Sequence, residues 1–508
     1  MSLHGLSLIG STHAQAKGTP FHGINPATGQ QLEPPFYPSS STDTGAACQL
    51  AAKAFPVYRK LAPHKRAEFL RAIASGIEGL GDELINRYRE ESGLPEERAL
   101  GERGRTCLQL NQFATLLESK HWNRAHSEEA DPGRQPLPKP ALARQLVAIG
   151  PVAIFGPANF PLAYDVAGGD TAAALAAGCP VVVKAHAGHP GTSELVGQAI
   201  LNAADTTGMP EGVFSLLFDS GTTVGSALVQ HPVIKAVGFT GSERGGRALF
   251  DLAASRPEPI PVFAEMSSIN PVSILPRKLS RDARSLAAGF VGSLTLGVGQ
   301  FCTNPGLVLL PDTADAERFI DEVLNLLRER QPEVMLNGGI HESYLSGLKR
   351  LSGTGGVTCL LNSGELLNAP GFRAGPALFK VDSGVFASQP ELREEVFGPA
   401  SLLVICREKA DYLTVLEAIG GQLTASIHAM DEDLEDFPEL IGKLETKAGR
   451  IICNGWPTGV EVCPAMVHGG PYPATTDSRF TAVGIQSISR FLRPVCYQNF
   501  SKEALEEI

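Results

Sequence analysis

The sequence contains no stretch of about eighteen uninterrupted apolar residues, the length that a helix needs to cross a membrane. The apolar run from Leu146 to Phe155 is interrupted by Gly150 and Pro151. Segment 1–20 also lacks the charged region followed by an apolar core that marks a secretory signal. We therefore expect a cytoplasmic protein with no membrane partner.

Paired cysteines and basic runs are absent as well. The nine cysteines include no C-x-x-C pair, which is typical of free thiols in a reducing compartment. His186 and His189 have no carboxylate or cysteine at ligand spacing beside them, so we expect no metal. The formal net charge is −11, and without a basic run it argues against nucleic acid as a partner. A small molecule is the expected partner.

Three common catalytic motifs are missing. No G-x-G-x-x-G follows the first strand of the predicted α/β region, and no phosphate-loop lysine motif or G-x-S-x-G occurs. Ordinary dinucleotide-binding dehydrogenases, phosphate-loop enzymes and serine hydrolases of the α/β type therefore lose support.

The chain of 508 residues exceeds what one hydrophobic core usually supports, so we expect two or three domains. Residues 21–33 predict a hairpin around a Pro and Gly turn. Segments 43–92 and 96–117 show helical periodicity, interrupted near Pro63. The Pro-rich segment 128–140 predicts a linker or an extended arm.

Beyond this linker, β-branched apolar runs alternate with helical patterns. The alternation predicts a parallel α/β sheet of the kind that binds nucleotides, and the pattern starts again with new strands from Glu265 to about residue 485. The tail SISRFLRPVCYQNF alternates like an edge strand. The predicted fold class is therefore α/β, with two parallel-sheet units.

Cys302 lies in a loop between two apolar runs, FVGSLTLGVGQFCTNPGLVLL. Gly297, Gly299 and Gly306 free the backbone on both sides. A partly exposed thiol in such a loop can be a reactive thiolate. One cysteine among nine can equally be a small buried hydrophobe, and the loop alone does not separate the two.

Gly241 and Ser242 lie between a strand and a helix in GFTGSERGG. Unpaired N–H groups and the helix dipole at such a turn favour a pyrophosphate, although an ordinary capped turn explains the same residues.

Taken in order, six strings resemble the aldehyde dehydrogenase superfamily over nearly the whole chain: GPANFP at 156–161, VVVKA ending at 185, FTGS at 239–242, AEMSSINPV at 264–272, GQFCTNPG at 299–306 and EEVFGP at 394–399. Three further strings resemble its α-ketoglutaric semialdehyde (2,5-dioxovalerate) and NADP-dependent fatty aldehyde branch: ERGRTCLQLNQFA at 102–114, HPGTSE at 189–194 and the ending AVGIQSISRFLRPVCYQN.

The resemblance implies a catalytic role for three residues. Cys302 attacks the aldehyde to give a thiohemiacetal anion, and Asn159 stabilises that anion together with the Cys302 backbone N–H. Glu265 is the general base for thioester hydrolysis, in a desolvated setting beside Phe263 and Met266. Its presence favours a free acid as product. The family usually has two glycines after the residue that follows this glutamate, whereas this chain has Ser267 and Ser268.

The resemblance also implies a nicotinamide cofactor. Lys184 matches the lysine at the adenosine ribose, and Glu395 with Phe397 matches the pair that holds the nicotinamide end. Ala187 stands where a glutamate often marks NAD preference. The absence of that glutamate removes a repulsion on the order of 1 kcal/mol against a 2′-phosphate. We therefore expect NADP, with NAD possible, although no Lys or Arg occurs in 219–225.

The substrate tunnel implied by the resemblance is lined by the residues Tyr164, Gly168, Phe301 and Thr303 and by the loop 456–467. Tyr164 and Gly168 are expected on the helix that follows GPANFP. Arg105 and Gln109 lie four residues apart on a predicted helix and share a face. They either hold the distal carboxylate of a semialdehyde acid or are solvated surface residues.

The resemblance implies two Rossmann-like domains and a β arm. We expect a cofactor-binding domain at 1–130 and 151–264, a catalytic domain at 265–486, and an oligomerisation arm at 131–150 and 487–508. The arm implies a homodimer or a homotetramer.

The preferred activity is the oxidation of α-ketoglutaric semialdehyde to α-ketoglutarate. A medium-chain or long-chain aliphatic aldehyde is the alternative substrate. A catalytically silent binding or structural homologue is the alternative of another class.

Overall fold

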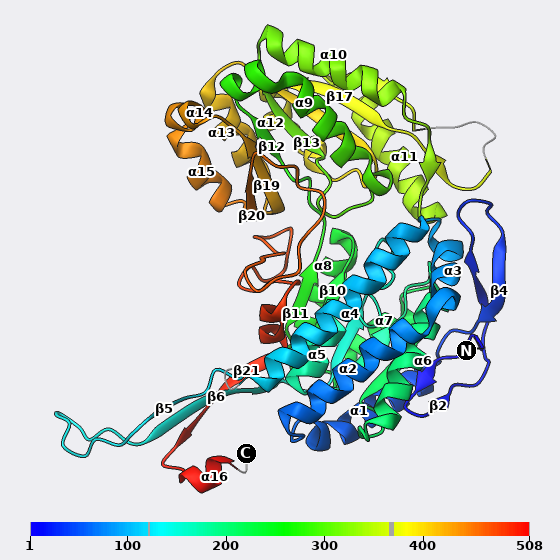
Figure 1. Ribbon diagram of the computed structural model, residues 1–508, viewed down its shortest axis with the longest axis vertical. Helices are drawn as coiled ribbons and strands as arrows, with labels where there is room; N and C mark the ends of the chain where they lie inside the picture. The colour runs from blue at the N-terminus through cyan, green and yellow to red at the C-terminus, as the bar shows by residue number, and fades with distance from the viewer. Residues whose placement is uncertain (1, 120–121, 365–369, 507–508) are drawn as a thin grey trace.

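The computed structural model describes residues 2–119, 122–364 and 370–506. The predicted ranges 1–130, 265–486 and 487–508 include a few positions outside this described part. The chain forms two α/β lobes, and a long β arm projects from the first of them (Figure 1).

The first lobe is built on a seven-stranded sheet in the order β11-β10-β7-β8-β9-β1-β2. The five strands β11 to β9 run parallel, and β1 adds antiparallel to β9. Val181–Val183 are fully buried, as expected for a strand covered by helices on both faces. The strands are β1 Leu8–Ile9, β2 Thr12–His13, β7 Val152–Phe155, β8 Val181–Lys184, β9 Phe214–Leu217, β10 Ala236–Thr240 and β11 Val262–Glu265.

Among the described residues, eight helices belong to the first lobe: α1 Ser41–Tyr58, α2 Pro63–Gly79, α3 Gly81–Ser92, α4 Glu96–Glu118, α5 Gly169–Ala177, α6 Pro190–Thr206, α7 Thr223–Gln230 and α8 Glu243–Ala254. The break near Pro63 is confirmed. A further break at Leu80 was not predicted, and it occurs where Gly81 adopts a φ of 53°.

The second lobe contains a seven-stranded sheet in the order β15-β17-β18-β13-β12-β19-β20, parallel except for β15. Its strands are β12 Val272–Ile274, β13 Leu307–Pro311, β15 Thr358–Asn362, β17 Ala377–Asp382, β18 Ala400–Cys406, β19 Gln422–His428 and β20 Ala448–Cys453. Its helices are α9 Pro276–Thr295, α10 Ala314–Arg328, α11 Gly338–Gly353, α12 Ser383–Ser388, α13 Lys409–Ala418, α14 Asp431–Asp436 and α15 Pro438–Glu445.

Two small antiparallel sheets complete the lobes. The predicted N-terminal hairpin is present as β3 Phe21–Ile24 and β4 Gln31–Phe36. The second pair is β14 Glu333–Val334 with β16 Arg373–Ala374. Short 3-10 turns lie at η1 Leu296–Gly299, η2 Pro390–Arg393 and η3 Ile485–Phe491.

The arm is a three-stranded antiparallel sheet in the order β21-β6-β5. Its strands are β5 His126–Glu128, β6 Leu142–Ala148 and β21 Leu492–Gln498, and the chain then ends in α16 Lys502–Glu506. The sheet includes residues before 131, since β5 pairs with the outer half of β6. The alternating tail does form an edge strand, because β6 is the only neighbour of β21 in this sheet among the described residues.

Residues 454–491 leave the second sheet and pack against the first lobe. Thr475 bridges to Glu265 at the end of β11, and the N–H of Met266 donates to the Ala474 carbonyl at 2.8 Å. Phe480 packs edge-on against Phe263. This return brings side chains from late in the sequence to the carboxyl end of β11.

The return segment is held by a buried ion pair. The Arg490 guanidinium lies 2.8 Å from the Asp170 carboxylate in α5, and the two side chains are 2% and 9% exposed. Burial raises the pKa of Asp170, and Arg490 acts in the opposite direction. Removing either partner leaves the other polar group buried without its counter-ion.

We therefore expect Arg490→Met to lower the free energy of unfolding by about 3–5 kcal/mol, measured by urea denaturation. The double variant Asp170→Asn with Arg490→Met should lose clearly less of its free energy of unfolding, because no buried carboxylate is left without its counter-ion. Equal losses in the single and double variants would contradict this account of the pair.

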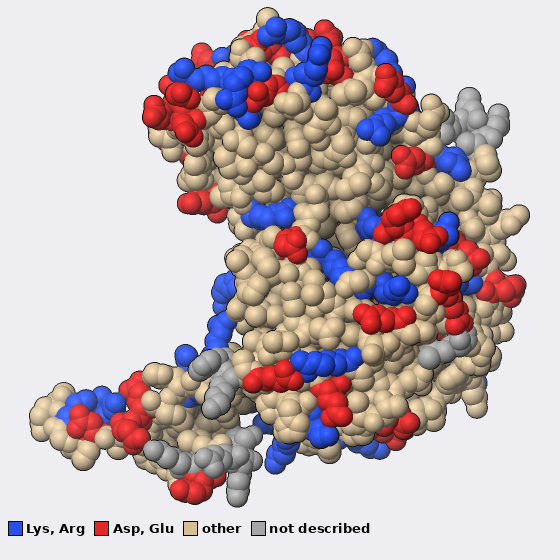
Figure 2. Space-filling model, viewed as in Figure 1, with Lys and Arg blue, Asp and Glu red and all other residues tan. Residues whose placement is uncertain are grey.

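Charges of both signs are interspersed over the face shown in Figure 2, with no continuous basic patch on that face. In the described part of the chain, no helix has both the length and the apolar character needed to cross a membrane.

Candidate active site

A cavity of about 430 Å³ opens beside the carboxyl ends of β7, β10 and β11. Ligands of parallel α/β sheets bind at this edge. The lining contains seven of the residues predicted from sequence: Asn159, Gly241, Ser242, Glu265, Cys302, Glu395 and Phe397. Side chains from both lobes therefore meet around one space.

The loop that carries Cys302 has an unusual backbone. Gly297, Val298 and Gly299 have φ values of 56°, 59° and 64°. A Cβ at residue 299 would collide with the backbone of Gly398, so this position requires glycine. Gly306, on the other side of Cys302, is not among the glycines with a positive φ. The strained residue is the β-branched Val298, which the sequence did not single out.

The Asn270 side chain anchors the Cys302 loop on the side away from the cavity. Its side-chain nitrogen donates to the Cys302 and Asn304 carbonyls, both at 2.9 Å. The Asn304 side chain donates in turn to the Gly398 carbonyl at 3.0 Å. These bonds fix the loop from behind, so that the Cys302 side chain faces the cavity.

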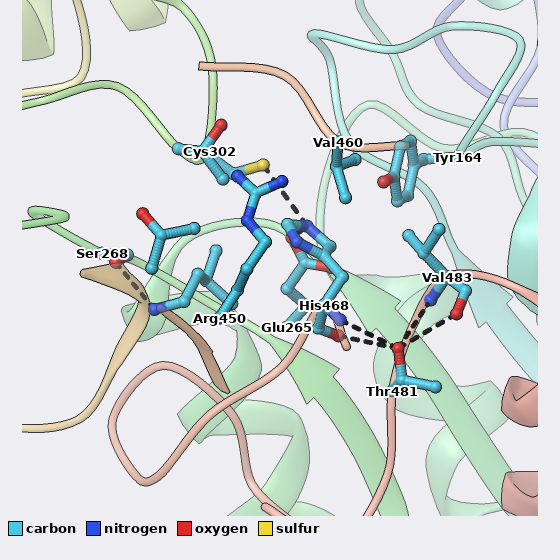
Figure 3. A network of polar contacts seen from close by, with 12 residues as sticks. Tyr164, Glu265, Ser268, Cys302, Arg450, Val460, His468, Thr481 and Val483 are labelled. Carbon is cyan, nitrogen blue, oxygen red and sulfur yellow. Dashed lines mark hydrogen bonds and ion pairs between the residues drawn. The ribbon is translucent and has the colours of Figure 1, made fainter. Parts of the chain in front are cut away.

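A histidine absent from the sequence predictions lies beside the reactive thiol. His468 Nε2 lies 3.6 Å from Cys302 Sγ and 2.8 Å from Glu265 Oε1 (Figure 3). His468 is fully buried and Glu265 is 1% exposed. The backbone N–H of His468 donates to Thr481 Oγ1 at 2.9 Å. One imidazole nitrogen thus connects the predicted nucleophile to the predicted base.

In the sequence, His468 is distinguished only by its position directly before a Gly-Gly-Pro turn. Its two partners lie 203 and 166 residues earlier in the chain. The return of 454–491 to the first lobe creates these contacts.

The pKa of the Cys302 thiol is raised well above its ordinary value. Burial is the main cause, and the carboxylates of Glu265 and Glu395 add to it, whereas the Arg105 guanidinium lowers this pKa. The thiol is therefore largely protonated at rest, and a base must take its proton before it can attack.

Asn159 lies at the wall of the same cavity and is 8% exposed. Its side-chain nitrogen donates one hydrogen to the Gln300 carbonyl at 3.0 Å. The second hydrogen of this amide remains for another acceptor. The backbone N–H of Cys302 has no hydrogen-bond acceptor among the described residues.

The serines that replace the family glycines have specific partners. Ser267 Oγ accepts from the Glu243 N–H at 3.3 Å, and Ser268 Oγ donates to Gln422 Oε1 at 3.0 Å. Where the family has two glycines, this chain therefore has two serines whose hydrogen bonds connect the loop to both lobes.

The predicted cofactor residues lie around the cavity and at its edge. Ser242 caps α8 by accepting from the Gly245 N–H at 3.2 Å. Lys184 ends β8, and burial lowers its pKa, whereas Asp219 and Asp165 act in the opposite direction. Ala187 lies in the turn after β8 and does not line the cavity, whereas its neighbour His186 does.

Burial raises the pKa of Glu395 to about 7, opposed by hydrogen bonds from the Ser267 side chain and the Ser268 backbone. This carboxyl group therefore changes its charge near neutral pH.

Two of the predicted substrate residues were placed on the wrong element. Tyr164 lies in a series of turns, and α5 begins only at Gly169, after Gly168 as its N-cap. A side chain at Gly168 would collide with the backbone of Tyr164, because the turns fold tightly against the helix start. The helix that was expected directly after GPANFP is therefore absent.

The remaining predicted substrate residues surround the loop 457–460. Thr303 Oγ1 accepts from the Gly459 N–H at 3.2 Å, and Phe301 packs edge-on against Phe160 at 5.5 Å. Arg105 and Gln109 do share one face of α4. Arg105 donates to the Val460 carbonyl and to Tyr164 Oη.

A second guanidinium, from Arg450, was not predicted. It donates to the Pro457 and Gly459 carbonyls at 2.7 and 2.9 Å. Figure 3 shows it close to Cys302, and the two groups interact electrostatically. The Nε atoms of Arg105 and Arg450 are buried without a partner, and neither arginine forms an ion pair with a described carboxylate.

Comparison with known proteins decides the family. Residues 12–472 match the aldehyde dehydrogenase family. The chain belongs to the aldehyde dehydrogenase family. As an aldehyde dehydrogenase it oxidises aldehydes with a nicotinamide cofactor, NAD or NADP.

Two curated relatives of this aldehyde dehydrogenase match along nearly their whole length. One is alpha-ketoglutaric semialdehyde dehydrogenase 2 of Azospirillum brasilense, which is 50% identical and covers 100% of this chain and 96% of the relative. The other is alpha-ketoglutaric semialdehyde dehydrogenase of Acinetobacter baylyi, which is 44% identical over 99% of this chain and 95% of the relative.

Solved structures confirm the α/β aldehyde dehydrogenase fold. Betaine aldehyde dehydrogenase from Staphylococcus aureus, in complex with NAD⁺, superposes with a TM-score of 0.83 at 17% identity, covering 98% and 95% of the two chains. A 3,6-anhydro-L-galactose dehydrogenase in complex with NADP gives a TM-score of 0.82 at 20% identity, covering 97% and 99%.

The residues around the cavity suit a nicotinamide cofactor. The cavity lies at the carboxyl edge of the parallel sheet, where dinucleotides bind, and Ser242 at the N-cap of α8 lines it. Glu395 lines the cavity and offers a half-buried carboxylate for hydroxyl donors. Cys302 and Glu265 border the same space.

Proposed function

We propose that this aldehyde dehydrogenase oxidises α-ketoglutaric semialdehyde to α-ketoglutarate. The observation that carries the proposal is the pair of unneutralised guanidiniums, Arg105 and Arg450, near the nucleophilic thiol. The 50% and 44% identity to two α-ketoglutaric semialdehyde dehydrogenases supports the same substrate. An aliphatic aldehyde carries no carboxylate for these cations.

In this proposal Cys302 is the nucleophile. Its proton passes to the Glu265 and His468 pair, whose nitrogen lies 3.6 Å from the sulfur and 2.8 Å from the carboxylate. The thiolate then attacks the aldehyde carbon, and a carbon–sulfur bond forms.

The resulting oxyanion is held by Asn159 and by the backbone N–H of Cys302. The Asn159 amide has a second hydrogen, and the Cys302 N–H has its only hydrogen, without an acceptor among the described residues. Donors aimed at developing charge in a water-poor site lower the barrier most effectively. Glu395 and Phe397 would hold the nicotinamide end of the cofactor, and the cofactor would supply the hydride acceptor.

The pair releases the first proton to solvent, and the Glu265 carboxylate then activates water against the thioester. Its Oε1 bonds to His468, whereas its Oε2 is buried and has no partner among the described residues. This second oxygen is free to take a proton from a water molecule, and hydrolysis releases the free acid.

Arg105 binds the distal carboxylate in this proposal, with Gln109 beside it. The Gln109 side-chain nitrogen is buried and has no partner, so it has a hydrogen bond to offer. A carboxylate held by a guanidinium gains charge-assisted hydrogen bonds, which are about twice as strong as neutral ones.

Replacing Arg105 tests the substrate. We expect Arg105→Gln to raise KM for α-ketoglutaric semialdehyde by about tenfold or more, since a charged hydrogen bond contributes about 1.5–3 kcal/mol. KM for hexanal should stay within about twofold. Arg103→Gln, on the same helix, is the matched control, because Arg103 bonds to Gly81 on another face.

A substrate panel distinguishes the alternatives. We expect a higher kcat/KM for α-ketoglutaric semialdehyde than for hexanal, octanal or decanal. A higher value for the alkanals would reject the semialdehyde and favour the fatty aldehyde alternative.

We propose NADP as the preferred cofactor, with NAD also accepted. The support is Ala187, which leaves no carboxylate at the position where glutamate repels a 2′-phosphate, and the nearby Lys184. Steady-state reduction of both cofactors tests this, and a higher kcat/KM with NAD would reject it.

Cofactor binding should depend on pH through Glu395, whose pKa is raised to about 7. Below this pH the group is protonated and is a weaker acceptor, whereas above it the carboxylate accepts ribose hydroxyls strongly. We expect KM for the cofactor to fall by about threefold to fivefold between about pH 6 and pH 8. Glu395→Gln should raise KM and remove this pH dependence, and an unchanged profile would exclude Glu395 as its origin.

We further propose that the arm at 131–150 and 487–508 pairs subunits into a homodimer or homotetramer. The support is the outer strand β5, which has an unpaired edge among the described residues. A cytoplasmic location is proposed because all nine cysteines are free.

A further inference from the structure

Glu265, Cys302 and His468 form one compact group of metal-binding side chains. A carboxylate oxygen, a sulfur and an imidazole nitrogen all lie within 4.8 Å of one another. In the described part of the chain this is the one group of three or more such residues. Oxygen, sulfur and nitrogen donors together are the set that Zn²⁺ binds in proteins.

Two of the three donor separations come close to those around a tetrahedral ion, and the third, between Cys302 and Glu265, is within 4.8 Å. Zn²⁺ bonds of about 2.0–2.3 Å imply donor atoms roughly 3.3–3.6 Å apart. His468 Nε2 lies 3.6 Å from Cys302 Sγ, which already matches. The 2.8 Å separation from Glu265 Oε1 needs to open by about half an ångström, within reach of a carboxylate rotation.

A second observation points to a ligand at this place. Glu265 Oε2 and His468 Nδ1 are buried without a hydrogen-bond partner, so the polar capacity of the group is only partly used. Once the thiol proton has left, the Cys302 thiolate and the Glu265 carboxylate supply two negative charges at short range. A divalent cation between them would remove their mutual repulsion and leave a neutral buried group.

We propose that Glu265, Cys302 and His468 bind Zn²⁺ and that this binding reversibly blocks the enzyme. On binding, the thiol proton leaves to solvent and a zinc–sulfur bond forms, with no change of oxidation state. The fourth position of the ion faces the cavity and takes water. The bound sulfur no longer attacks an aldehyde, so Zn²⁺ and aldehyde compete for the enzyme. This inhibition rests on the proposed role of Cys302, whereas the binding itself does not.

The sequence predicted no metal, on the basis of His186 and His189. The proposed zinc site uses neither of them and supplies no catalytic metal. It arises because the return segment 454–491 brings His468 between the other two residues.

Cobalt titration of metal-free enzyme tests the site without measuring activity. We expect one Co²⁺ per chain, with the near-ultraviolet charge-transfer band of a cobalt–thiolate bond and the visible bands of a tetrahedral ion. Zn²⁺ should displace it with equal stoichiometry. Cys302→Ser should lose the charge-transfer band, and His468→Gln should weaken binding by at least about tenfold.

Cys453→Ser is the matched control, because Cys453 is an exposed free thiol outside the group. It should keep the band unchanged. Loss of the band in Cys453→Ser, its survival in Cys302→Ser, or its absence from the wild-type enzyme would each overturn the site. Circular dichroism and cofactor binding show whether each variant is folded.

Inhibition completes the test. We expect Zn²⁺ to inhibit wild-type turnover competitively with aldehyde, and a chelator to restore it. Metal binding at the three residues without inhibition would reject the proposed block and would also count against Cys302 as nucleophile. Inhibition without the cobalt–thiolate band would place the inhibitory ion elsewhere.

Discussion

Cys302→Ala should lower the steady-state rate of cofactor reduction by at least about 10⁴-fold with every aldehyde tested. No other described thiol borders the cavity, so the carbon–sulfur bond that precedes hydride loss cannot form. Cofactor reduction followed by absorbance measures the effect.

Two controls make this result specific. Cofactor affinity of Cys302→Ala, from fluorescence quenching, should stay within about threefold, because the cavity walls remain in place. Cys359→Ser should keep full activity, since Cys359 is an exposed thiol outside the cavity lining. Unchanged cofactor reduction by Cys302→Ala would reject the covalent route.

Glu265→Gln should slow turnover by about 10²–10⁴-fold while leaving the first turnover visible. The amide cannot take a proton from water, so the thioester accumulates. Rapid mixing should show a burst of reduced cofactor close to one per active site, followed by a slow steady state.

The size of the burst separates two roles of Glu265. A burst that persists assigns the residue to thioester hydrolysis, with His468 able to accept the thiol proton. Loss of both burst and steady state would show that Glu265 is required before hydride leaves. His468→Phe, which removes only the imidazole, should slow the burst itself.

The parallel-sheet fold could be predicted because its strands can be recognised from short stretches of the sequence. Val181–Val183 form an apolar run that only a strand covered on both faces explains, and the turn at Gly241 and Ser242 follows a strand directly. Ordered motifs then located Cys302, Glu265 and Asn159, which the structure brings to one cavity.

The rest of the site depends on contacts that no local pattern contains. His468 reaches the thiol because the return segment 454–491 packs against the first lobe, whereas Arg450 lies in β20 of the second sheet. Nothing in their immediate sequence gives the position of their partners. The turns before α5 were also missed, since small residues around Tyr164 suit a helix as well as tight turns.

The Cys302 environment shows why sequence alone misjudges reactivity. A glycine-rich loop suggested a reactive thiolate, whereas burial and two carboxylates raise the pKa of this thiol well above its ordinary value. In the proposed mechanism the proton therefore passes to the adjacent carboxylate and imidazole rather than to solvent. That assignment requires distances between residues far apart in the sequence.

The most direct measurement is mass spectrometry of Glu265→Gln after mixing with NADP and α-ketoglutaric semialdehyde. We expect one acyl group per chain, located on the peptide that contains Cys302 and absent when NADP is omitted. No acyl group, or one on another cysteine, would contradict the proposed catalysis by Cys302 and Glu265.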